Sequence, residues 1–151
     1  MERQQLPEDF KDFIQCLNSS NVKYLLIGGW AVGLHGYPRA TKDIDFFILI
    51  DNINLENLEK ALISFGAPPV DIDYLREKGN VIRFGVSPIL IDIINDADGI
   101  DFKECYSRKE IIIADNMEVP LISKADLIIN KKSTGRKADL ADVEKLEYIR
   151  G

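Results

Sequence analysis

Asp43 and Asp45 are the first residues in the sequence whose types and spacing suggest chemistry. They stand at the start of a predicted strand over residues 44–50, and side chains two apart on a strand share a face, so their carboxylates should lie side by side. Parallel carboxylates repel each other unless a cation lies between them, and hard oxygen ligands favour Mg²⁺ or Mn²⁺. The alternative is a solvent-facing edge with alternating Asp, which the following apolar run FFILI disfavours because such a run enters a core.

Asp92 is a third carboxylate in an unusual place. It interrupts the apolar run ILIDII, which otherwise predicts a buried strand over residues 89–94. An unpaired carboxylate there would cost several kcal/mol, so Asp92 needs a cation, a hydrogen-bond network or a solvent-facing cleft. The sequence leaves these three open, and the distance along the chain from Asp45 allows neighbouring strands without establishing them.

Gly28 and Gly29 follow a short apolar strand predicted over residues 24–27 and precede a short helix predicted over residues 30–35. Glycine lets the backbone approach a ligand closely, and the first N–H groups of a helix lack intrahelical partners. Such a turn can hold a phosphate. Taken alone, the pair is also typical of an ordinary tight turn.

The whole chain must position these groups, and its composition indicates an ordinary globular domain. It has 151 residues, of which 46% are hydrophobic and 29% charged, and we expect a single domain over 1–151 whose C-terminal helices, about 123–150, pack on the core. Helices and short strands alternate without a strict βαβ rhythm, which predicts an α/β (α+β) fold with a mixed, twisted sheet flanked by helices. Further helices are expected over 7–18, 55–65, 74–78, near 102, 123–132 and 137–149, and further strands over 81–86, 110–114 and 118–121. Residues 95–99 resemble a calcium loop but lack its required acids and predict a turn.

Charge and motif content exclude several classes of protein. The net charge of −6 disfavours bulk binding of duplex DNA, because an acidic chain is repelled by the phosphates. No apolar run approaches the ~18 residues of a membrane span, and the N-terminal stretch has no apolar signal region. The two cysteines have no CxxC spacing, which predicts reduced thiols and a cytoplasmic protein.

Together, these residues resemble a known family. The glycine pair, the pattern Arg39-x-Thr41-x-Asp43-x-Asp45 and the later Asp in an apolar strand are similar to nucleotidyltransferases of the DNA polymerase β type. The resemblance spans about residues 24–146 and is to their small bacterial members: minimal and toxin-type nucleotidyltransferases, and the aminoglycoside and lincosamide nucleotidyltransferases. One departure is Trp30, which stands where many members have Ser.

The resemblance implies a polymerase β-like fold and transfer of NMP from an NTP to an acceptor hydroxyl, with release of pyrophosphate. The resemblance implies that the catalytic residues Asp43, Asp45 and Asp92 also hold Mg²⁺, with Mn²⁺ as the alternative. Asp43 and Asp45 would bridge two metal ions. Asp92 would hold the ion that activates the acceptor hydroxyl and would also serve as a general base. The residues expected to bind the nucleotide are Gly28, Gly29, Arg39, Thr41, Lys124 and Lys131.

The cations of residues 124–137 allow two interpretations. They either lie at a solvated helix end or bind the NTP phosphates, and Asp139 and Asp142 are expected to pair with them along the helix. The remaining aromatic candidates are weaker. His35 is expected to pack or cap a helix. Trp30 and Tyr37 could stack on a base, but core packing is the usual role of a Trp beside a glycine pair.

The acceptor is not specified by the sequence. It could be a tRNA end, a protein or a small hydroxylated molecule. Little chain follows Asp92 for an extra helical domain, which favours a toxin-like or orphan enzyme over an antibiotic-modifying one. A catalytically inactive binding or antitoxin-type module is a further alternative, and a homo-oligomer is possible.

Overall fold

The sheet is the framework of the molecule. In the computed structural model, which describes residues 6–38, 41, 43–86 and 88–148, six strands form one mixed sheet in the order β3-β4-β2-β1-β6-β5. The elements have these bounds: α1 Glu8–Ser19, β1 Tyr24–Ile27, α2 Gly28–Leu34, β2 Asp43–Ile48, α3 Asn52–Phe65, a 3₁₀ helix Ile72–Arg76, β3 Val81–Val86, β4 Ile89–Ile94, α4 Phe102–Ser107, β5 Glu110–Ala114, β6 Met117–Leu121, α5 Lys124–Thr134 and α6 Lys137–Tyr148. The predicted mixed α/β class is confirmed.

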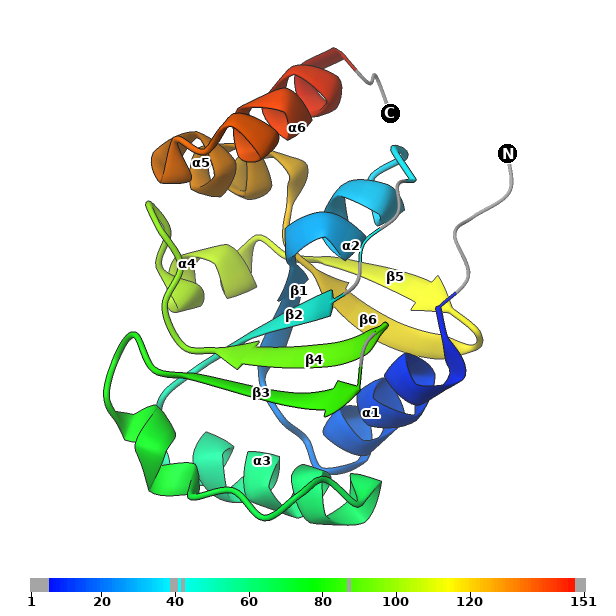
Figure 1. The fold of residues 1–151 in the computed structure, drawn as a ribbon, viewed down its shortest axis with the longest axis vertical. Coiled ribbons are helices and arrows are strands. Elements are labelled where there is room, and N and C mark those ends of the chain that lie inside the picture. The colour runs from blue at the N-terminus through cyan, green and yellow to red at the C-terminus, as the bar shows by residue number, and fades with distance from the viewer. Residues whose placement is uncertain (1–5, 39–40, 42, 87, 149–151) are drawn as a thin grey trace.

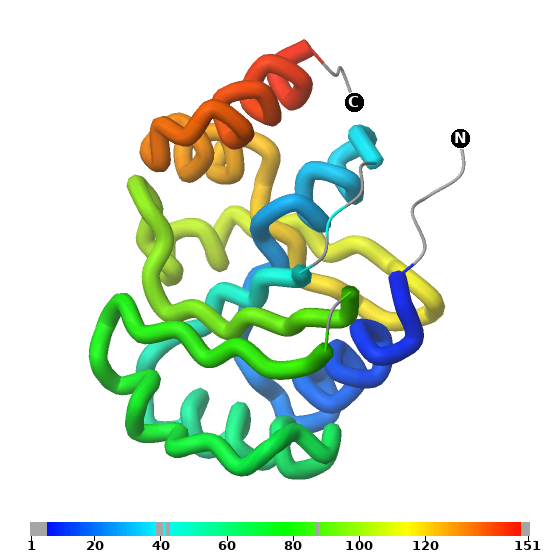
Figure 2. The backbone as a smooth tube through the Cα atoms, viewed as in Figure 1, coloured from blue at the N-terminus to red at the C-terminus, as the bar shows by residue number. Residues whose placement is uncertain are grey.

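The two faces of the sheet carry different helices. Helices α1 and α3 cover one face, and α2, α4, α5 and α6 lie on the other (Figure 1). The backbone tube shows the closing helices α5 and α6 on the same side as α2, although most of the chain separates them in sequence (Figure 2). The turn at Gly28 and Gly29 and the cations of residues 124–137 therefore lie on the same face of the sheet.

Successive side chains of β2 point to opposite faces of the sheet, so this strand contacts the helices on both sides. Phe46 points to the α1 side, where its ring meets the Phe13 ring edge-on at 5.2 Å between centroids. Phe47 points the other way and meets Phe102 of α4 at the same separation. Because alternate residues share a face, Asp43 and Asp45 lie on the α4 side with Phe47. The aromatic rings thus fix which face receives the carboxylates.

Element boundaries differ from the sequence prediction at a few places. Helix α2 begins at Gly28 rather than Trp30, because the positive φ of Gly28 turns the chain directly from β1 into the helix. Helix α3 begins at Asn52 rather than Leu55, because the Asp51 side chain accepts a hydrogen bond from the Asn54 N–H and caps it. Strand β2 spans Asp43–Ile48 rather than 44–50. Within the described residues, none of the helices is long and apolar enough to cross a membrane.

Candidate active site

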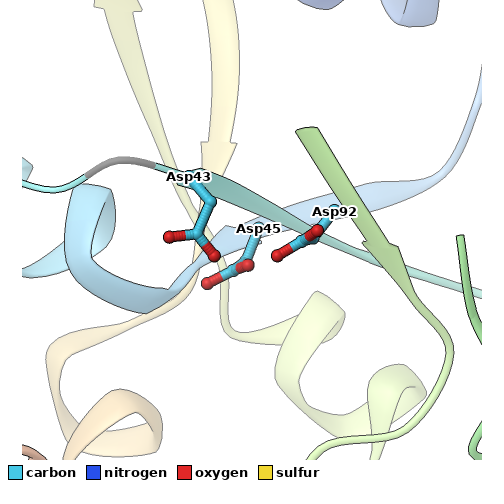
Figure 3. A group of neighbouring side chains, drawn as sticks. All are labelled: Asp43, Asp45 and Asp92. Atoms are coloured by element: carbon cyan, nitrogen blue, oxygen red, sulfur yellow. The ribbon is translucent and has the colours of Figure 1, made fainter. Parts of the chain in front are cut away.

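The three carboxylates predicted from sequence lie together. Strands β2 and β4 are parallel neighbours, and their register pairs Asp45 with Asp92. One carboxylate oxygen from each of Asp43, Asp45 and Asp92 lies within 4.8 Å of the others, and the side chains point into one space (Figure 3). We call these three residues the triad. Asp92 therefore belongs to a cluster of carboxylates and is not an isolated acid in the core or at the surface.

The three carboxylates of the triad differ in their pKa shifts. Burial, followed by the repulsion of Asp43 and Asp92, raises the pKa of Asp45 to about 7. Burial is also the main reason that the pKa of Asp43 is raised. Asp92 differs: burial would raise its pKa, but the hydrogen bonds with Arg83, Asp43 and Asp45 and the charge of Arg83 outweigh that effect and lower the pKa. Among the described residues, Arg83 is the cation that contacts the triad, and the charge of Lys131 acts more weakly on Asp45.

Arg83 is the residue that sequence analysis missed. It lies on β3 opposite Asp92, and its Nε and Nη2 donate to the two Asp92 carboxylate oxygens at 2.6 and 2.9 Å. Nη2 also lies 3.6 Å from an Asp43 oxygen. The sequence did contain the information needed to find it, because pairing the two predicted strands 81–86 and 89–94 end to end as a hairpin places Arg83 opposite Asp92.

Gly28 is required where the triad meets α2. Its φ is +74°, a conformation that side chains other than glycine rarely adopt. A Cβ added there would also overlap with Asp45 Oδ2. The Asp45 carboxylate therefore packs directly on the Gly28 backbone, and Gly28 and Gly29 both line the space in front of the triad.

This space is a cavity of about 560 Å³. The triad and Arg83 form one wall, and the residues at the junction of α5 and α6 form another. Thr41 lines it and donates to the Asp43 carbonyl oxygen at 3.4 Å. The turn at residues 96–98 closes a third side, where Asn130 Nδ2 donates to the Asp98 carbonyl oxygen at 2.9 Å. The predicted turn is confirmed, but its place beside the triad was not foreseen.

Comparison with known proteins places this site in a family. Residues 4–150 match the family described as nucleotidyltransferase of unknown function (DUF6036). The chain belongs to this nucleotidyltransferase family. Because the match covers nearly the whole chain, the resemblance inferred from the Gly and Asp motifs is confirmed, and the protein is a nucleotidyltransferase enzyme.

Solved structures show the same fold. The nucleotidyltransferase is similar to the lincosamide antibiotic adenylyltransferase LnuA bound to lincomycin, with a TM-score of 0.63, 17% identity, and coverage of 97% of this chain and 100% of that chain. It is also similar to a candidate nucleotidyltransferase from Thermotoga maritima, with a TM-score of 0.56, 16% identity, and coverage of 97% and 92%. No curated protein sequence matches this chain.

The cations at the C-terminal end of the nucleotidyltransferase are mostly paired. Lys131 is 6% exposed and lies 3.0 Å from Asp139 and 2.9 Å from Asp142. Arg136 is 75% exposed and contacts the same Asp139 at 2.8 Å. We call Lys131, Arg136, Asp139 and Asp142 the α5–α6 ion cluster. The expectation that Asp139 and Asp142 pair with these cations is confirmed.

The predicted nucleotide-binding residues are distributed unevenly around the cavity. Gly28, Gly29, Thr41 and Lys131 line it, and so does Arg136. Lys124, the first residue of α5, is not among the described residues that line it. Arg39 lies outside the described residues.

The histidine and the two aromatic residues that the sequence analysis singled out make packing and hydrogen-bond contacts. His35 is the C-cap residue after α2, and its Nε2 lies 2.7 Å from the Ile122 carbonyl oxygen. Trp30 is buried edge-on against Phe10. Tyr37 packs at the edge of the core beneath the ammonium of Lys145. The positions of His35 and Trp30 agree with the roles expected from the sequence.

Proposed function

We propose that this nucleotidyltransferase moves NMP from an NTP to an acceptor hydroxyl, using divalent cations held by the triad. The observation that carries the proposal is the convergence of Asp43, Asp45 and Asp92 from adjacent strands into the wall of one cavity. Among the described residues, Arg83 is the cation that contacts them, and the three carboxylates outnumber it.

The chemistry of the triad suits Mg²⁺, with Mn²⁺ as the alternative. Its ligands are hard carboxylate oxygens, and the raised pKa of Asp45 reflects a charge that burial and like-charged neighbours disfavour. A divalent cation among these oxygens would relieve that repulsion. When bound, such ions would stabilise the attacking and leaving oxygens of the transfer.

The two ends of the triad support different roles. Asp45 packs on Gly28, so we assign the triphosphate to the side lined by Gly28, Gly29 and Thr41, with Lys131 behind it. The remaining expected contacts, Arg39 and Lys124, belong to the same proposal.

We assign Asp92 to the acceptor side. There the acceptor oxygen forms a bond to the α-phosphorus, the bond from that phosphorus to pyrophosphate breaks, and Asp92 receives the hydroxyl proton. The protein's own contribution is positioning and charge neutralisation, as in phosphoryl transfer generally.

The acceptor belongs to one of three classes: a tRNA end, a protein or a small hydroxylated molecule. The shortness of the chain does not favour a toxin-like enzyme after all, because this chain covers the whole of LnuA, which is named as an antibiotic adenylyltransferase. That neighbour supports a small molecule as the first acceptor to test. We propose a cytoplasmic enzyme, and a homo-oligomer remains compatible with it.

The test is label transfer. The enzyme is incubated with Mg²⁺, each NTP labelled at the α-phosphate, and cell extract separated into RNA, protein and small molecules. We expect label from one NTP to enter one fraction, and none to enter it with Asp45→Asn. No transfer with any NTP, together with no thermal stabilisation by Mg²⁺ and NTP added jointly, would support the inactive binding module instead.

A further inference from the structure

Arg83 occupies the oxygens that a metal ion would need. Both carboxylate oxygens of Asp92 accept hydrogen bonds from its guanidinium, at 2.6 and 2.9 Å. The same guanidinium lies 3.6 Å from Asp43. Arg83 is therefore the counter-ion of the triad member that we assign to the acceptor side.

Arg83 is placed so that it can leave. Its side chain is 59% exposed, whereas that of Asp92 is 6% exposed. It projects from β3, an edge strand of the sheet, into the open cavity. A change of side-chain rotamer would release Asp92 without moving the backbone. Asp92, in contrast, is fixed between the buried residues Ile91 and Ile93.

We propose that Arg83 and a divalent cation exchange at Asp92: the guanidinium holds the carboxylate in the metal-free enzyme and leaves it when the cation binds. The inference rests on the proposed metal site. Arg83 thereby keeps the triad ordered before metal arrives and lowers metal affinity by competing for the same oxygens. Exchange also frees a guanidinium within the cavity at the moment when the site is loaded.

A simpler role makes the opposite prediction. If Arg83 only oriented Asp92 from outside the metal shell, its removal would weaken metal binding, as loss of an outer-shell partner typically does by 10- to 100-fold. If it competes with the metal, its removal strengthens metal binding. The sign of the change in metal affinity therefore separates exchange from support.

The chain contains a matched control. Arg108 makes the same two-point contact to Asp126, with both distances at 3.0 Å. The exposed fractions of the two side chains are 53% and 4%, close to those of the Arg83–Asp92 pair. Neither Arg108 nor Asp126 lines the cavity. Any general effect of breaking an Arg–Asp pair should appear equally in both.

The first experiment measures Mn²⁺ binding by calorimetry at pH 8 for the EDTA-treated wild type, Arg83→Ala and Arg108→Ala. A hydrogen-bonded charge pair of this kind corresponds to roughly a ten-fold or larger change in affinity. We expect the Mn²⁺ Kd of Arg83→Ala to fall about ten-fold and that of Arg108→Ala to stay at the wild-type value. An unchanged or increased Kd for Arg83→Ala would overturn the exchange. If none of the three proteins bound Mn²⁺, the proposed metal site itself would fail.

The second experiment uses the wild-type protein and so does not depend on the folding of a variant. Phenylglyoxal labelling of each arginine is followed by peptide mass spectrometry, with and without saturating Mn²⁺ and without nucleotide. We expect Mn²⁺ to raise the labelling rate of Arg83 several-fold and to leave Arg108 unchanged. Equal labelling of Arg83 in both conditions would show that it stays on Asp92, against the proposal.

Discussion

Two charged clusters face the same cavity and differ in their balance of charge. In the triad, three carboxylates share Arg83. In the α5–α6 ion cluster, two carboxylates face two cations, and Lys131 contacts both carboxylates at 3.0 Å or less. Counted over the residues that the structure describes, the triad has more negative than positive charge, whereas the α5–α6 ion cluster is balanced.

The pKa values reflect this difference. Burial and the neighbouring carboxylates raise the pKa of Asp45 to about 7. Burial acts in the same direction on Asp139, but hydrogen bonds from Thr134, Lys131 and Arg136 outweigh it and lower its pKa to about 2. Acidic residues in one cavity can thus have opposite roles. The balanced α5–α6 ion cluster stabilises the packing of α5 on α6, whereas the unbalanced triad is where we propose that a divalent cation binds.

The largest expected effect comes from removing one carboxylate of the triad. Asp45→Asn should reduce NMP transfer to background while the fold is retained, because the side chain keeps its shape but loses the charge on which the proposed metal site depends. The measurement is label transfer from the NTP found active with the wild type. Asp115→Asn is the control: it makes the same chemical change at an exposed turn residue that does not line the cavity. Near-normal turnover of Asp45→Asn would remove Asp45 from the proposed catalytic role.

The second prediction reverses the comparison by removing a cation from the balanced cluster. Lys131→Ala leaves Asp139 and Asp142 without their buried partner, which should lower the free energy of unfolding by about 3 kcal/mol. Lys132→Ala is the control, since this neighbour is 56% exposed and pairs with Glu147 at the surface, where such pairs contribute less than about 1 kcal/mol. Equal losses in urea denaturation would contradict the structural role of Lys131.

The third prediction concerns pH. In the unfolded chain Asp45 ionises near pH 4, whereas in the folded, metal-free protein it keeps its proton up to about pH 7. Between these values the folded state binds more protons, so raising the pH across this window lowers stability. In EDTA, the wild type should lose on the order of 2 kcal/mol more than Asp45→Asn between pH 4.5 and 8. Parallel pH profiles for the two proteins would contradict it.

The balanced cluster should show the opposite pH dependence. Because the folded pKa of Asp139 is lowered to about 2, its contribution to stability is present above the unfolded value near 4 and is lost as the pH falls through 2. Comparison of the wild type with Asp139→Asn by denaturation at pH 2 and pH 5 would show this, with the difference between them larger at pH 5.

Much of the site followed from local rules. Strand periodicity placed Asp43 and Asp45 on one face, and the apolar run around Asp92 predicted its strand. Sequence spacing could not show that β2 and β4 are neighbours, because α3 and β3 intervene and the pairing is decided by sheet topology. The family resemblance supplied what the spacing could not.

The adjacent lysines of α5 show the limit of sequence reasoning most clearly. Lys131 and Lys132 are chemically identical, yet one is buried in an ion cluster and the other is exposed. Helix phase places Lys131 on the same side as Leu127 and Asn130, which are also buried. That a lysine can be buried there depends on the two carboxylates of α6, and only the packing of α5 on α6 reveals those partners.

The smallest expected effect on stability tests whether the balanced cluster also binds nucleotide. Arg136 lines the cavity, is 75% exposed, and shares Asp139 with Lys131, so it can contact a phosphate without leaving a buried charge unpaired. Arg136→Ala should therefore change the free energy of unfolding by less than about 1 kcal/mol, as expected for an exposed ion pair. Loss of a charge-assisted contact to phosphate should raise the nucleotide Kd by roughly ten-fold or more.

The measurement is binding of each NTP as an analogue with a non-cleavable α–β linkage, in the presence of Mg²⁺. Arg76→Ala is the control, because Arg76 also pairs with an aspartate three residues away, Asp73, but lies outside the cavity. An increase in Kd for Arg136→Ala alone would show that the balanced cluster keeps one cation available for substrate while Lys131 maintains the packing. Equal affinities for the two variants would assign this cluster to stability alone and leave the Gly28–Gly29 side as the proposed phosphate contact.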